Sequence, residues 1–263
     1  MTRQNLPPII FFDIIGTVVE WRHSIANELN AAAQKALQDE SRHLGADLRI
    51  RASDMSMRIW HDITAEWHSS YMNFGNTHDA SKPFVSVDEH NRSSLEEILC
   101  KWLIRDLFDD GELHHLTLAW HRLAAHQDST AGLSRLGTKF PTSTLSNGNI
   151  QLLEDLKKHN SLPFTHITSA EHLGAYKPSP EAYHGAARRF GVETSQCCLV
   201  AAHLGDLQAA KKCGFYTIYV ERELEEAWNA KDVAQAREAG FVDYWVEVGG
   251  RGLVEVANYL GCE

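Results

Sequence analysis

The chain has 263 residues, of which 43% are hydrophobic and 23% are charged, and its formal net charge at pH 7 is -10. This length and apolar content allow one large or two modest globular domains with a substantial core. The negative charge, with no cluster of Lys and Arg to offset it, argues against a nucleic-acid partner or an acidic membrane surface.

No apolar run approaches the ~18 residues that a membrane span needs, and the N-terminus lacks the basic-then-apolar pattern of a signal peptide. The sequence therefore predicts an intracellular protein of the cytoplasm. The cysteines are odd in number and three of them lie in or beside apolar runs, which predicts reduced thiols and no zinc site. They are Cys100, Cys197, Cys198, Cys213 and Cys262.

The first clear pattern is the run of four large apolar residues at 9–12, which is followed by Asp13 and by the pair Gly16-Thr17. Such a run predicts a strand buried on both faces, and Gly-Thr marks a tight turn. In open α/β sheets, ligands bind at the carboxyl ends of the strands. Asp13 is therefore a candidate nucleophile or ligand, the alternative being a carboxylate that caps a turn.

Residues 25–128 carry apolar side chains at helical spacing and no convincing β pattern. The segment from Asn73 to Arg92 is rich in Asn, Ser, Asp and Gly, contains Pro83, and is expected to be a long loop. We interpret this block as an all-α insertion, the cap domain, at residues 23–130. Its four predicted helices have apolar faces within residues 25–37, 55–67, 95–102 and 113–123.

From Lys139 onward, short apolar strands alternate with helices, which predicts a parallel sheet with helices on both faces. The first strand belongs to the same sheet. We therefore expect an α/β core domain made of residues 1–22 and 131–263, interrupted by the cap. The later strands are predicted at residues 142–146, 166–168, 198–201, 216–220 and 244–247.

Polar side chains follow the ends of these strands or lie in loops beside them. Because the carboxyl ends of parallel strands meet at one edge of a sheet, we expect residues far apart in the chain to converge there. The residues are Asp13, Ser146, Asn147, Lys177 and Asp206. In this order and context they resemble the motifs of the haloacid dehalogenase superfamily: DxxGT, a Ser or Thr, a Lys, and Asp after the fourth strand. The resemblance covers nearly the whole chain and implies a Rossmann-like core with a helical cap.

Two positions distinguish branches of that superfamily. Its phosphatases use a second Asp two residues after the nucleophile and an Asp four residues before the last motif Asp, and here these positions are Ile15 and Ala202. An aliphatic side chain neither shuttles a proton nor coordinates magnesium. The chain is instead similar to the L-2-haloacid dehalogenases, which need no metal or other cofactor. Tyr183, six residues beyond Lys177, also resembles that branch.

The resemblance implies a role for each motif residue. Asp13 would attack the halogen-bearing carbon with inversion, leaving an ester that water hydrolyses. Lys177 would favour the ionised form of Asp13, and Thr17 would hydrogen-bond it. Ser146 and Lys177 would hold the carboxylate of the substrate, a small 2-halo acid. Asn147 would support the loop, and Asp206 would position or deprotonate the hydrolytic water.

A cap arginine would receive the departing halide, since a cation offsets the developing charge. Arg58 is our candidate for this arginine. Alternatively, Arg58 is only a solvent-exposed charge on a helix, and Arg22, Arg49 or Arg51 receives the halide instead. Tyr183 is either a core aromatic or a hydroxyl that reaches the catalytic groups.

The loop before Asp206 departs from the dehalogenase pattern. Ala201 stands where those enzymes carry Ser, and His203 where they carry Asn. We expect His203 to act as a halide donor or as a base for ester hydrolysis, in preference to a structural histidine.

The leading hypothesis is therefore a metal-independent hydrolase of small 2-halo acids. Two alternatives stay open: a magnesium-dependent phosphatase of a small metabolite, and a binding protein that keeps the fold without chemistry. The resemblance also makes a homodimer formed through the cap plausible, although packing within one chain explains the same apolar residues.

Overall fold

The computed structural model describes residues 7–77 and 85–262. Their contacts separate two compact units. Residues 7–20 and 124–262 form the first, here called the core unit, and residues 21–77 and 85–123 form the second, the cap unit. The boundaries after residues 20 and 123 differ from the predicted limits at 22 and 130, because the strand Ala124–Ala125 (β3) pairs with Val19–Glu20 (β2) inside the core unit.

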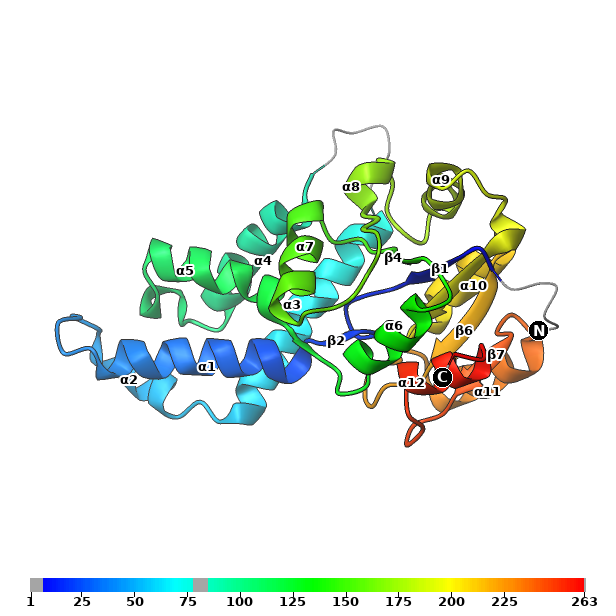
Figure 1. Cartoon of the computed structure of the whole chain (residues 1–263). Coiled ribbons are helices and arrows are strands. Elements are labelled where there is room, and N and C mark those ends of the chain that lie inside the picture. The colour runs from blue at the N-terminus through cyan, green and yellow to red at the C-terminus, as the bar shows by residue number, and fades with distance from the viewer. Residues whose placement is uncertain (1–6, 78–84, 263) are drawn as a thin grey trace. The chain divides into compact units, whose positions relative to one another are not determined.

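The core unit contains a five-stranded parallel sheet in the order β4-β1-β5-β6-β7. Figure 1 labels β4, β1, β6 and β7 of this sheet. This architecture confirms the predicted Rossmann-like α/β fold. The strands are β1 (Ile9–Phe12), β4 (Thr142–Thr144), β5 (Cys197–Ala201), β6 (Tyr216–Val220) and β7 (Tyr244–Val246). Every residue of β1 is at most 2% exposed, as its apolar run predicts.

The prediction of a strand at residues 166–168 is wrong. Within this segment only His166 forms a bridge, to Ser143 of β4, and a second isolated bridge follows between Ser169 and Ser146. Side-chain hydroxyls bind the backbone there: Thr144 Oγ1 donates to the carbonyl of Thr168 and accepts from its N–H. Because these hydroxyls replace part of the backbone ladder, the segment lies along the sheet without extending it.

Both faces of the sheet are covered. Phe11 of β1 packs against Phe190 and Phe215 on one face, with ring centroids 5.5 and 6.0 Å apart. Phe12 points to the other face and meets Phe164 at 5.6 Å. The helices of this unit are α6 (Ser129–Gly137), α7 (Ile150–His159), α8 (Ala170–Leu173), α9 (Pro180–Arg189), α10 (Leu204–Lys212), α11 (Ala230–Ala239) and α12 (Leu253–Tyr259).

The cap unit is helical, as expected, but its helices differ from the predicted set. They are α1 (Arg22–Gln38), α2 (Ala46–Ser53), α3 (Met57–Thr77), α4 (Val87–Lys101) and α5 (Asp110–Thr117), which a 3-10 turn (Leu118–Arg122) continues. Helix α2 is absent from the sequence-based set.

The long loop expected from Asn73 to Arg92 is wrong for most of its length. Helix α3 runs on to Thr77, and α4 begins at Val87 after a capping box between Ser86 and Glu89. The rest of that prediction, residues 78–84 with Pro83, lies outside the described residues. In the described part of the chain, no helix is long and apolar enough to span a membrane.

Candidate active site

Asp13 leaves β1 at the carboxyl end of the sheet and is 8% exposed. Its Oδ1 accepts a hydrogen bond from Lys177 Nζ at 2.9 Å, and its Oδ2 accepts one from Thr17 Oγ1 at 2.7 Å. Burial opposes ionisation, but the charge of Lys177 and the bond from His203 outweigh it and hold the pKa of Asp13 well below its usual range. The residue is therefore an oriented, ionised carboxylate.

Lys177 lies between two carboxylates. Its Nζ is 2.9 Å from Asp13 Oδ1 and 2.5 Å from Asp206 Oδ2, and the residue is 7% exposed. Burial lowers the pKa of the ammonium, but the two carboxylates more than compensate and raise it. Asn147 fixes the lysine backbone by donating from Nδ2 to its carbonyl (3.0 Å) and accepting from its N–H (2.7 Å).

Asp206 lies in the first turn of α10. Its Oδ1 accepts a hydrogen bond of 2.6 Å from the hydroxyl of Tyr183, which is fully buried on α9. Burial and the nearby Asp206 charge raise the pKa of Tyr183 well above its ordinary value, so the hydroxyl stays protonated and donates. Both oxygens of Asp206 are thus engaged, one by Tyr183 and one by Lys177. Ser146 follows β4, is buried, and its Oγ accepts from the N–H of Gly148 at 3.2 Å.

His203 bridges two carboxylates at the start of α10. Its Nδ1 lies 3.1 Å from Asp13 Oδ2, and its Nε2 lies 3.1 Å from Glu225 Oε1. Burial lowers the pKa of the imidazole, but the hydrogen bonds and charges of the two carboxylates outweigh it and raise the pKa to about 10. At neutral pH both ring nitrogens are therefore protonated and donate. Because both are already engaged, this geometry does not favour His203 as a halide donor.

Glu225 is the site residue that the sequence analysis missed. It follows β6 and is 8% exposed. Its carboxylate lies directly against Gly16 of the DxxGT motif, since a Cβ built at Gly16 would stand 2.1 Å from Glu225 Oε1. The signal was present, because Glu225-Glu226 follow a predicted strand at the same carboxyl edge that singled out Asp13.

We expect Gly16→Ala to impair both folding and the site. Gly16 has φ of 83°, which an alanine adopts only with strain, and the new methyl group would displace the Glu225 carboxylate. The expected destabilisation is about 1–3 kcal/mol, measured by denaturant unfolding. Gly137→Ala is the matched control, because a Cβ there meets nothing within 4 Å. Equal stability of the two variants would contradict this account.

His203 predicts a pH dependence of stability. Its folded-state pKa of about 10 lies above the ~6.5 of an unfolded histidine. Its contribution is therefore complete below about pH 6.5 and is lost as the pH rises through 10. We expect the unfolding free energy of the wild type to fall between pH 7 and 10 and that of His203→Gln to fall less steeply. Parallel curves from denaturant titrations would disprove this prediction.

The four candidate arginines all belong to the cap unit. Arg49 donates to the carbonyls of Leu37 and Arg42, and Arg51 donates to that of Leu103. These two side chains therefore hold the cap backbone. Arg58 is exposed on α3, and the guanidinium of Arg22 lies 4.3 Å above the Trp21 ring. A halide-receiving role stays a prediction for Arg58 and for Arg22.

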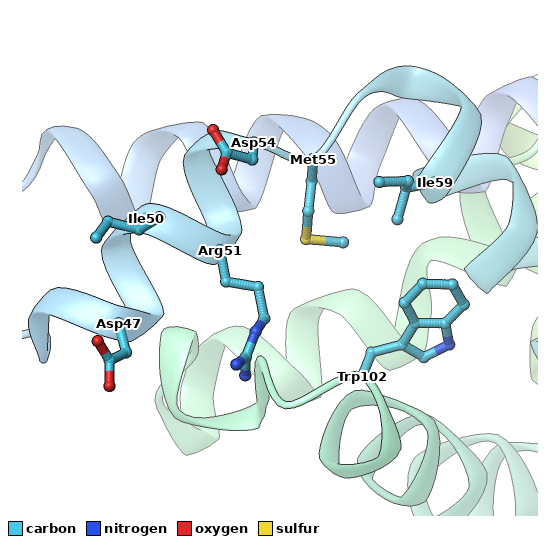
Figure 2. Close-up of a pocket in the computed structure, with 7 residues that line it drawn as sticks. All are labelled: Asp47, Ile50, Arg51, Asp54, Met55, Ile59 and Trp102. Carbon is cyan, nitrogen blue, oxygen red and sulfur yellow. The ribbon is translucent and has the colours of Figure 1, made fainter.

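A surface pocket of about 510 Å³ also lies in the cap unit. Figure 2 shows the side chains that line it. It is lined by Asp47, Ile50, Arg51, Asp54, Met55, Ile59 and Trp102. It contains none of the interacting charges around Asp13. Those charges mark the candidate site better than this pocket does, because buried ionisable groups with shifted pKa values cluster at functional sites.

The residues around Asp13 do not fit a magnesium site of the phosphatase kind. Ile15 and Ala202, at the positions where phosphatases carry Asp, are both buried, and the ammonium of Lys177 separates Asp13 from Asp206. Across the described ranges, no group of three His, Cys, Asp or Glu side chains is arranged to hold a metal ion.

Sequence comparison relates this site to known proteins. A family model for haloacid dehalogenase-like hydrolases matches residues 7–214. An (S)-2-haloacid dehalogenase of Pseudomonas putida is 27% identical over 196 residues, which cover 72% of this chain and 83% of that protein. An (S)-2-haloacid dehalogenase of Burkholderia cepacia is 33% identical over 116 residues, so the chain matches half of that relative's length.

Solved structures give the same relationship. A defluorinating L-2-haloacid dehalogenase superposes with a TM-score of 0.78 at 28% identity, covering 97% of this chain and 95% of that one. Another L-2-haloacid dehalogenase has a TM-score of 0.78 at 27% identity and is covered completely. Because the family match runs from residue 7 to residue 214 and thus spans Asp13, Lys177 and Asp206, the chain belongs to the haloacid dehalogenase-like hydrolases.

Proposed function

We propose that this chain is a hydrolytic dehalogenase of small 2-halo carboxylic acids that forms an ester on Asp13 and uses no metal or other cofactor. The observation that carries the proposal is the buried Asp13 carboxylate, with one oxygen bound by Lys177 and the other by Thr17. Relatives named as (S)-2-haloacid dehalogenases support the substrate class.

In the first step, an oxygen of Asp13 attacks the carbon that bears the halogen. The new C–O bond forms as the C–halogen bond breaks, and the halide leaves with the bonding electrons and with inversion at carbon. Ser146 and Lys177 hold the substrate carboxylate, and Asn147 keeps the lysine backbone in place. A cap arginine, Arg58 in our proposal, offsets the charge of the departing halide.

In the second step, water adds to the Asp13 ester, the 2-hydroxy acid leaves, and the carboxylate is restored. This step needs a base. Asp206 and His203 are the two candidates that the sequence offers near Asp13. Asp206 already accepts hydrogen bonds from Tyr183 and Lys177, so we assign it the role of holding these two side chains in place.

The test is halide release in the presence of EDTA. We expect turnover of L-2-chloropropionate or of a haloacetate, with fluoroacetate included because one structural relative is a defluorinating enzyme. In oxygen-18 water, repeated turnover should also place label in the Asp13 carboxylate. The matched controls are D-2-chloropropionate, which tests stereospecificity, and the Asp13→Asn variant.

Two outcomes would replace this function by its alternatives. Magnesium-stimulated release of phosphate from phosphomonoesters, with no halide release, would favour the phosphatase. Binding of 2-halo acids with neither halide release nor label in Asp13 would favour a non-catalytic binding protein. The proposal also includes a cytoplasmic location, a small-molecule partner and no nucleic-acid partner, and sedimentation would test the predicted homodimer.

A further inference from the structure

Glu225, His203 and Asp13 form a continuous hydrogen-bonded chain. The exposed fractions of these side chains are 6% for Glu225, 18% for His203 and 11% for Asp13. Two bonds fix the segment that carries Glu225. Arg222 Nε donates to the carbonyl of Thr17 at 3.1 Å, and Glu226 Oε2 accepts from the N–H of Leu204 at 2.8 Å. The imidazole is therefore held at both ends by anchored elements.

The two contacts of the imidazole respond differently to the reaction. Glu225 forms no covalent bond in the reaction, so its carboxylate stays beside Nε2. Asp13 loses its charge when it becomes an ester, and an ester oxygen is a much weaker partner for a cation than a carboxylate. The imidazolium of the free enzyme thus loses one of its two stabilising charges at the moment the halide is displaced.

We propose that His203 releases one proton to solvent when Asp13 is esterified and then serves as the base that activates the hydrolytic water, with Glu225 as its positioning residue. This inference rests on the proposed function and deepens it, because it names the base and states at which step the proton is released. Glu225 lies beyond residue 214, where the family match ends.

The atoms and charges balance. Displacement converts the Asp13 carboxylate and the haloacid into the ester and a halide ion, after which imidazolium gives up the Nδ1 proton. The water oxygen then bonds to the Asp13 carbonyl carbon. One water proton goes to Nδ1 of His203 and the other to the departing alkoxide, which leaves as the hydroxy acid. The cycle restores the Asp13 carboxylate and imidazolium, and releases one halide and one proton in total.

Three other charged side chains lie near His203, on its own helix and on the segments packed against it. Asp206, on the same helix, is occupied by Lys177, whose ammonium also binds Asp13 Oδ1. Glu226 faces the backbone at the start of α10. None of these three groups is hydrogen-bonded to the imidazole, so Asp13 and Glu225 dominate its protonation.

The decisive measurement follows protons and halide together during a single turnover. A rapid-mixing experiment with L-2-chloropropionate, excess enzyme, weak buffer and a pH indicator should show one proton per halide before the hydroxy acid forms. The double variant His203→Gln/Glu225→Gln removes the cation together with its buried partner anion. It should release one equivalent of halide without a proton, accumulate the Asp13 ester detectable by mass spectrometry, and turn over about 10²–10⁴-fold more slowly.

Three results of this experiment would overturn the inference alone. The first is release of a proton together with the halide in the double variant, and the second is steady turnover of that variant at the wild-type rate. The third is loss of the halide burst in the double variant, because this would place His203 in the displacement step. Absence of halide release from the wild type with every 2-halo acid would instead overturn the proposed function.

Glu225→Gln separates a positioning role from a merely structural one. Removing this anion makes imidazolium less favourable, so the low-pH limb of the ester-hydrolysis rate should shift toward lower pH by about one unit or more. Glu226→Gln is the matched control, because it removes a neighbouring carboxylate that binds Leu204 rather than His203. An unshifted limb in Glu225→Gln, or an equal shift in Glu226→Gln, would overturn the role of Glu225.

Discussion

Asp13→Asn is expected to lower the turnover of 2-halo acids by on the order of 10⁴-fold or more. The amide has no anionic oxygen to displace a halide, although it fills the same space and keeps a hydrogen-bond acceptor for Thr17. Halide release in steady state measures the effect. The peptide that contains residue 13 should also show no ester mass after exposure to the substrate.

The matched control is Asp110→Asn at the start of α5, where the side chain is 85% exposed. It makes the same chemical change without touching the site and should leave turnover unchanged. Wild-type activity in Asp13→Asn, or an ester trapped on another residue, would refute the assignment of the nucleophile.

Lys177→Met is expected to abolish detectable turnover and to destabilise the core unit by about 3–5 kcal/mol. The ammonium neutralises Asp13 and Asp206 at 2.9 and 2.5 Å, so its loss leaves two nearby carboxylates without their buried cation. Denaturant unfolding measures the change in free energy. The deficit should shrink as the pH falls through the acid range, because Lys177 lowers the pKa of Asp13 and this stabilisation is lost once Asp13 is protonated.

Lys211→Met provides the comparison for stability. Lys211 pairs with Asp243 at 2.7 Å, but its side chain is 33% exposed, so its loss should cost less than about 1 kcal/mol. A Lys177→Met protein as stable as Lys211→Met, or one that retains turnover, would show that the central ammonium does not hold this site together.

The parts of the fold that the sequence predicts well are those in which local pattern and burial coincide. The apolar run at residues 9–12 forms β1 because a strand covered on both faces tolerates only such residues. Helix α2 was not predicted from the sequence, because it buries only Ala52 and so has little apolar periodicity to detect. The polar end of α3 stays helical where Phe74 stacks on His90 of α4, with ring centroids 4.4 Å apart.

The sequence by itself determined the family motifs, the α/β order and the convergence of Asp13 and Asp206, because the ends of parallel strands share one edge whatever the details of packing. Lys177 joins them from the loop between α8 and α9. Only the tertiary structure decided which groups the two ring nitrogens of His203 contact. Its contacts reach 190 residues back to Asp13 and 22 residues on to Glu225. Such distances depend on how loops settle against one another, and no local pattern in the chain encodes them.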